Sequence, residues 1–123
     1  MEVGDVVEIE SILNSIKDYC SVSESETDFD NELLMYTNNA FVLLSQIGVG
    51  PSTPFTISDD QATWDELNLD STLLPMVKNY IYLKVRMLFD APQNSSLNTA
   101  MKESAAEYEW RLNLFGDHSF EVS

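Results

Sequence analysis

Apolar and polar residues follow one another along this chain with the three-and-four spacing of helices rather than the alternation of strands. The first apolar stripe runs from Val6 to Cys20 and predicts a helix that begins at Asp5. Asp5 can cap this helix while Glu8 reaches back toward it, which is a capping-box arrangement. Residues 21–27 are polar and aperiodic, so we expect a short linker there.

A second and wider apolar pattern covers residues 28–47 and predicts the central helix. Asp28, Asp30 and Glu32 lie in its expected first turn, where negative charge complements the helix dipole. Gly48 follows the last apolar position and can adopt the left-handed conformation that ends many helices.

Residues 49–60 contain prolines and glycine that exclude a helix, so we expect a long extended loop between the second and third helices. Phe55 and Ile57 alternate with hydroxyl residues in this loop, a pattern that also allows a short strand or arm. Thr63 and Glu66 form a second capping-box signature, which predicts a single helical turn.

Two further helices are predicted over residues 72–89 and 96–113. Pro75 falls in the first turn of the earlier one, where its missing N–H costs little, and Pro92 follows its end. Residues 114–123 lie beyond the last predicted helix and are too few to bury their own apolar side chains, so we expect a tail that frays or docks elsewhere. The inner stripes end at the helix hairpin with Leu88 and begin again with Leu97, then continue through Met101, Ala105, Tyr108 and Leu112.

These elements predict an all-α fold, a small bundle of four main helices with a long extended loop and a C-terminal tail. The length of 123 residues suits a single domain spanning residues 1–123, and 44% hydrophobic residues can supply its core. No apolar run reaches the roughly 18 residues of a membrane span, and the start of the chain has no signal-peptide pattern. We therefore expect a soluble protein made in the cytoplasm, where the single Cys20 stays reduced.

The charge of the chain restricts its possible partners. Residues 1–70 carry 15 acids and one cation, Lys17, for a net of −14, whereas residues 71–123 carry six acids and five cations, for a net of −1. Binding to nucleic-acid phosphates requires clustered Lys and Arg, so the sequence argues against it. A solvated acidic surface that confers solubility is the simplest explanation of the excess.

The sequence offers no catalytic or metal-binding constellation. His118 is the only histidine and has no cysteine near it, while Cys20 closes an apolar stripe and is expected to be buried. A calcium loop starting at Asp28 fails, because its sixth position is Leu33 rather than Gly and its twelfth is Asn39 rather than Glu. We expect no enzymatic activity, no cofactor and no bound metal.

Residues 30–113 carry a family resemblance in the order of their motifs. After the first helix pair come Gly-Val-Gly at residues 48–50, Tyr-Leu-Lys-x-Arg-x-x-Phe-Asp-x-Pro at residues 82–92 and Glu-Trp-Arg-Leu at residues 109–112. In this order the chain resembles the small head–tail connector proteins, also called adaptor or head-completion proteins, of tailed bacteriophages and prophages of Gram-positive bacteria.

The resemblance implies a structural protein of the virion neck that forms a ring of about a dozen copies beneath the portal. The partners that it implies are the portal protein on one side of the ring and a stopper or tail-completion protein on the other. DNA would pass through the channel during packaging and ejection without sequence-specific binding. The family implies no catalytic site, no cofactor and no membrane contact.

Side chains outside the inner stripes are the candidate contacts with other subunits or the portal. Tyr82 and Trp110 are large aromatics of this kind, although partial burial within one subunit explains them equally well. The loop 49–60 and the tail 114–123 are expected docking arms, in part by analogy with the family. The candidate interface residues are Phe55, Ile57, Tyr82, Lys84, Arg86, Trp110, Arg111, Phe115, Phe120 and Val122.

Three alternatives stay open at the level of sequence. The low pI and small size also suit an acidic DNA mimic that inhibits a host DNA-acting enzyme. A different neck or tail-completion subunit would have the same building role, and a small regulatory protein outside the virion is a third possibility. For a ring, the acidic half could line the DNA channel or form an outward rim.

Overall fold

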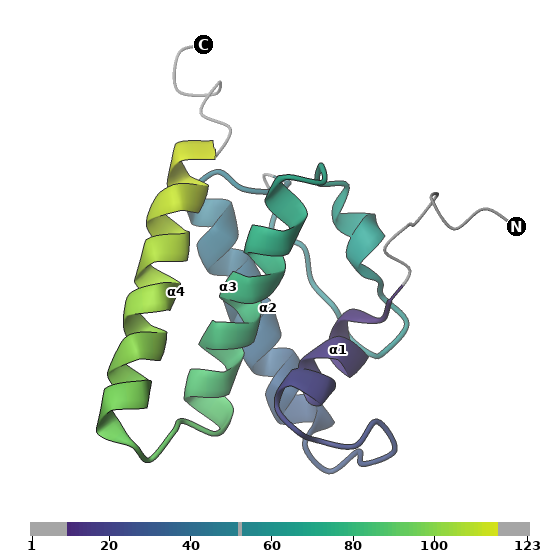
Figure 1. Ribbon diagram of the computed structural model, residues 1–123. Helices are drawn as coiled ribbons and strands as arrows, with labels where there is room; N and C mark the ends of the chain where they lie inside the picture. The colour runs from purple at the N-terminus through teal and green to yellow at the C-terminus, as the bar shows by residue number, and fades with distance from the viewer. Residues whose placement is uncertain (1–9, 52, 116–123) are drawn as a thin grey trace, which may run out of the picture.

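The computed structural model describes residues 10–51 and 53–115, and within these ranges it contains four α-helices and one short 3-10 helix. The elements are α1 (Ile12–Tyr19), α2 (Asp30–Gln46), η1 (Trp64–Leu67), α3 (Leu73–Phe89) and α4 (Ser95–Phe115) (Figure 1). The described ranges hold no strand, only one isolated antiparallel bridge between Ser11 and Thr63. The predicted all-α fold with a long loop between α2 and α3 is confirmed.

Helix α3 lies at the centre of the bundle (Figure 1). It packs against α1, α2 and α4, whereas the main contact of α4 is with α3 alone. Figure 1 shows α4 on one side of α3, with α1 and η1 on the other. None of the helices in the described ranges is long and apolar enough to span a bilayer.

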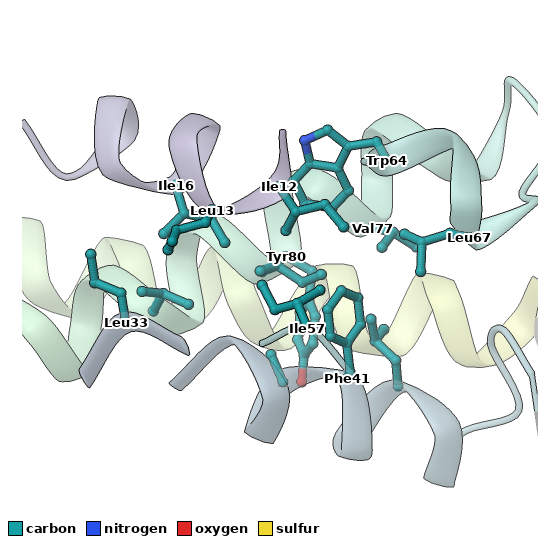
Figure 2. Close-up of a cluster of buried hydrophobic side chains, with 14 of the residues drawn as sticks. Ile12, Leu13, Ile16, Leu33, Phe41, Ile57, Trp64, Leu67, Val77 and Tyr80 are labelled. Carbon is teal, nitrogen blue, oxygen red and sulfur yellow. The ribbon is translucent and has the colours of Figure 1, made fainter. Parts of the chain in front are cut away.

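The core is continuous and contains residues of all five elements, although α4 contributes only from its inner side (Figure 2). Trp64 of η1 is fully buried and sits beside Ile12 of α1, and its indole Nε1–H donates to Ser15 Oγ at 2.9 Å. The other labelled members of the cluster are Leu13, Ile16, Leu33, Phe41, Ile57, Leu67, Val77 and Tyr80. A chain of this size thus completes its core within one copy.

The first helix begins later than the sequence predicts. Ser11 has extended backbone, with φ −62° and ψ 132°, and its hydroxyl accepts the Asn14 N–H at 3.2 Å, so that α1 starts at Ile12. The sequence predicts one unbroken helix from Asp5. This is wrong, because Ser11 is extended and pairs with Thr63 before α1 begins. The predicted Asp5 cap itself lies outside the described residues.

The other helix ends follow local signals closely. Both α2 and α3 begin and end within about two residues of the predicted bounds, an ordinary uncertainty for helix ends. The capping box at η1 is present, since the Glu66 carboxylate accepts the Thr63 N–H at 3.1 Å. Gly48 has φ 85°, the left-handed conformation expected at the end of α2.

Helix α4 extends two residues further than predicted, and Leu114 and Phe115 belong to it rather than to a tail. The predicted inner stripes are wrong at the α3–α4 hairpin, where Leu88 and Leu97 are half exposed. These two residues flank the connection between the helices, beyond the last layer of core. Periodicity alone does not show where a neighbouring element stops covering a helix.

The extended loop belongs to the core, which corrects a prediction. The Asn38 side chain of α2 binds both backbone groups of Ile57, donating to its C=O at 2.9 Å and accepting its N–H at 2.8 Å. Ile57 is buried, and Phe55 packs edge-on against Phe41 with ring centroids 5.3 Å apart. The expectation that these side chains have little core to join is wrong, because Ile57 is buried and Phe55 packs against the core.

Lys17, the one cation of the acidic half, is buried at the junction of α1, α2 and the linker. Its ammonium lies 2.8 Å from the Asp30 carboxylate and donates to the Glu24 carbonyl at 3.1 Å. Lysine is rarely fully buried unless it is paired. This pair therefore holds the polar linker and the first turn of α2 against the end of α1.

Candidate interaction surfaces

The described residues contain no group of three or more His, Cys, Asp or Glu side chains that could hold a metal ion. Cys20 is buried, and this burial raises the pKa of its thiol to about 11, with Arg86 lowering it and Asp90 raising it by smaller amounts. A buried thiol that stays protonated at neutral pH is a poor nucleophile.

Cys20 gives a direct test of this packing through pH. The thiol pKa rises from an ordinary 9.0 to about 11 on folding, so its contribution to stability is complete below pH 9 and is lost as the pH rises toward 11. We expect Cys20→Ala to remove about 1–3 kcal/mol of this alkaline loss, measured by urea unfolding at pH 8 and pH 11. Equal alkaline losses in both proteins would contradict a buried, neutral thiol.

The C-terminal end of α4 carries three large exposed apolar side chains. Trp110, Leu114 and Phe115 are 63%, 64% and 56% exposed. Trp110 and Leu114 lie one turn apart on the outer side of α4, while Leu112 between them is buried. We call these three exposed residues the α4 apolar end. Large exposed aromatics are typical of protein contacts rather than of free helix surfaces.

The predicted interface residues have different environments in the structure. Tyr82 is half buried and stacks on Tyr19 with ring centroids 4.9 Å apart, so its own subunit accounts for part of its surface. Arg86 donates from Nε to the Asp90 carbonyl at 3.2 Å, at the end of its own helix. Arg111 pairs with Glu107 at 2.7 Å on the exposed surface of α4.

Of the remaining predicted residues, Lys84 is half buried on α3, with its ammonium 5.9 Å from the centre of the Tyr80 ring. Trp110 and Phe115 belong to the α4 apolar end, where more than half of each side chain is exposed. Phe120 and Val122 lie outside the described residues. The predicted residues thus do not form one patch. Leu114 of the α4 apolar end was not named among them, although it belongs to the predicted docking tail 114–123.

Exposed acidic side chains are concentrated around α1 and η1. Eight of them lie on or next to α1 and η1, the elements that Figure 1 shows on the side of α3 away from α4. They are Asp18, Glu24, Asp28, Asp59, Asp60, Asp65, Glu66 and Asp70. Every cation of the described chain except Lys17 lies on α3 or α4. Asp90, Glu103, Glu107 and Glu109 also lie on or next to these helices, so the α3–α4 part is close to neutral whereas the α1–η1 part is strongly acidic.

A profile of the phage connector proteins matches residues 12–119, which is most of the chain. The chain belongs to the phage connector protein family. The match confirms the resemblance seen in the motif order, and it assigns the protein a structural role in the phage virion. No curated protein and no solved structure gives a significant match to it.

The limits of the family match separate two kinds of feature in this connector protein. All four α-helices, the acidic loops and the α4 apolar end fall inside the match. The first eleven residues precede it.

Proposed function

We propose that this connector protein is the adaptor that assembles as a ring between the portal and the tail and continues the DNA channel. The observation that carries the proposal is the α4 apolar end. Trp110, Leu114 and Phe115 remain exposed although the core beneath α4 is already complete around the fully buried Leu112. An apolar group of this size at the tip of the longest helix suits a contact with the portal or with another subunit.

The distribution of charge supports a ring with two unlike contact faces. Like-charged surfaces repel at contact distance, so the acidic loops of two copies cannot face each other favourably. The cation-bearing side of α3 and α4 can meet the acidic side of the next copy, a head-to-tail arrangement that closes into rings. An acidic face repeated around a channel would also keep DNA from adhering to its wall.

Mass photometry of the purified protein with and without portal tests the proposal. We expect either a ring of the free protein or capture of the monomer by portal into a complex of defined mass. A protein that remains monomeric in both cases contradicts the adaptor role. Tight binding of that monomer to a DNA-acting enzyme would instead favour an acidic DNA mimic.

The α4 apolar end should dominate the assembly affinity. We expect Trp110→Ala to weaken portal capture or ring formation at least tenfold, because truncating a central aromatic contact costs about 2 kcal/mol or more. Met35→Ala on α2 is the matched control, since Met35 is equally exposed at 60% but lies outside this group. Circular dichroism should show unchanged helix content in both variants. Equal assembly by both would exclude the α4 apolar end as a contact.

The proposal includes the absence of catalysis. A protein that acts by packing against neighbours needs no activated nucleophile, and the one cysteine of the chain is buried and protonated at neutral pH. The protein would act through assembly alone. The α4 apolar end would supply contact area, and the charge distribution would determine which faces meet.

A further inference from the structure

A groove lies between α2, α3 and α4, on the side of the bundle away from η1. It encloses about 480 Å³, and its lining includes Asn39 of α2, Leu88 of α3 and Ala106 of α4. Tyr80 forms part of its lining and donates from its hydroxyl to Glu109 at 3.0 Å. Burial and then this hydrogen bond raise the Tyr80 pKa, so the tyrosine stays neutral. The groove thus combines apolar side chains with a fixed polar pair.

Two lysines line the groove without a carboxylate partner among the described residues. Lys84 lies over the Tyr80 ring, and Lys102 is exposed on α4. The other cations of α3 and α4 are occupied locally, for example Arg111 by Glu107. Two lysines without a carboxylate partner beside apolar side chains favour an acidic, apolar occupant of the groove.

Residues 2–9 have the matching chemistry. Their sequence, Glu-Val-Gly-Asp-Val-Val-Glu-Ile, contains three acids, four aliphatic side chains and no cation. They precede the family match, which begins at residue 12. We call this segment the N-terminal arm. Acids can pair with the lysines while the aliphatic side chains cover Leu88 and Ala106.

We propose that the groove between α2, α3 and α4 binds the N-terminal arm of the adjacent copy. This inference rests on the proposed ring, because it requires a neighbour. Each copy would give its arm on one side and receive an arm on the other, which is the heterologous contact that a closed ring uses. The arm would tie neighbours together through contacts that residues 12–119 of the family match do not provide.

The position of Glu10 favours a neighbour's groove over the copy's own. Glu10 is held beside η1, since its carbonyl accepts the Trp64 N–H at 3.3 Å and its carboxylate lies 3.4 Å from Lys78. Lys78 and the groove residues Tyr80 and Lys84 lie on different faces of α3, so Glu10 lies on the far side of α3 from its own groove.

Disulfide trapping between two different chains tests the contact directly. In a Cys20→Ser background, one chain carries Val6→Cys and the other, with an affinity tag, carries Ala106→Cys. We expect the mixed disulfide to form at least tenfold faster than with a control partner carrying Glu103→Cys, because Glu103 is exposed on α4 outside the groove. Equal rates for the two partners would overturn the proposal.

Charge reversal provides a second and independent test. We expect Lys84→Glu with Lys102→Glu to weaken self-association about tenfold at low salt, since two attractive contacts become repulsive. Adding Glu2→Lys, Asp5→Lys and Glu8→Lys in the same chain should restore it. Lys102→Glu alone should also weaken self-association, and it should not disturb folding, because Lys102 is exposed whereas Lys84 is half buried.

The outcomes separate the two proposals. Rings that persist after deletion of residues 2–9 and show no specific disulfide leave the adaptor role intact and overturn the arm contact. A dependence on residues 116–123 instead would assign the groove to the C-terminal segment and also overturn it. Both proposals are overturned if the wild-type chain stays monomeric alone and with portal and the cysteine variants form no mixed disulfide.

Discussion

Trp64→Ala is expected to lower the free energy of unfolding by about 3–5 kcal/mol, a large part of the stability of a small domain. The indole is fully buried between η1 and α1, meets Tyr82 edge-on with ring centroids 6.0 Å apart and binds Ser15. Its removal leaves a cavity and an unpaired acceptor where two distant segments join. Urea unfolding followed by circular dichroism measures the loss.

Trp64→Phe separates the two contributions. The phenyl ring keeps much of the buried area but cannot donate to Ser15, so we expect a loss of about 1–2 kcal/mol beyond the small change in volume. Tryptophan fluorescence offers a second reading, because only the exposed Trp110 remains in either variant. An alanine variant as stable as the wild type would show that η1 does not anchor α1.

Lys17→Met is expected to lower the free energy of unfolding by about 3 kcal/mol, although methionine is apolar and similar in length. The change leaves the Asp30 carboxylate without its cation and the Glu24 carbonyl without its donor. The Asp30 side chain is 27% exposed, so water offsets part of the loss and places the effect at the low end for a broken buried pair. Urea unfolding is again the measurement.

The matched control is the double variant Lys17→Met with Asp30→Asn. Removing both charges avoids an uncompensated carboxylate, so we expect the double variant to recover most of the loss of the single one. Asp30→Asn alone, which leaves the buried ammonium unpaired, should be as damaging as Lys17→Met. Additive losses in the double variant would mean that the two residues do not form a coupled pair.

The sequence by itself determined the helices, most of their ends and the family. Those features depend on local signals, such as the Thr63–Glu66 capping box, the left-handed Gly48 and the prolines around α3, and local signals are complete within a few residues. The motif order that indicated a phage connector is also a property of the sequence alone, and the family profile over residues 12–119 confirms it.

The tertiary structure decided which side chains are free to meet a partner. Ile57 is buried because Asn38, 19 residues earlier, binds its backbone, and Tyr82 is half covered because Tyr19 stacks on it. Nothing in the sequence around Lys17 predicts its burial, which depends on Asp30 lying beside it in the fold. Exposure depends on contacts between residues far apart in sequence, and periodicity within one helix carries no information about which neighbour covers which turn.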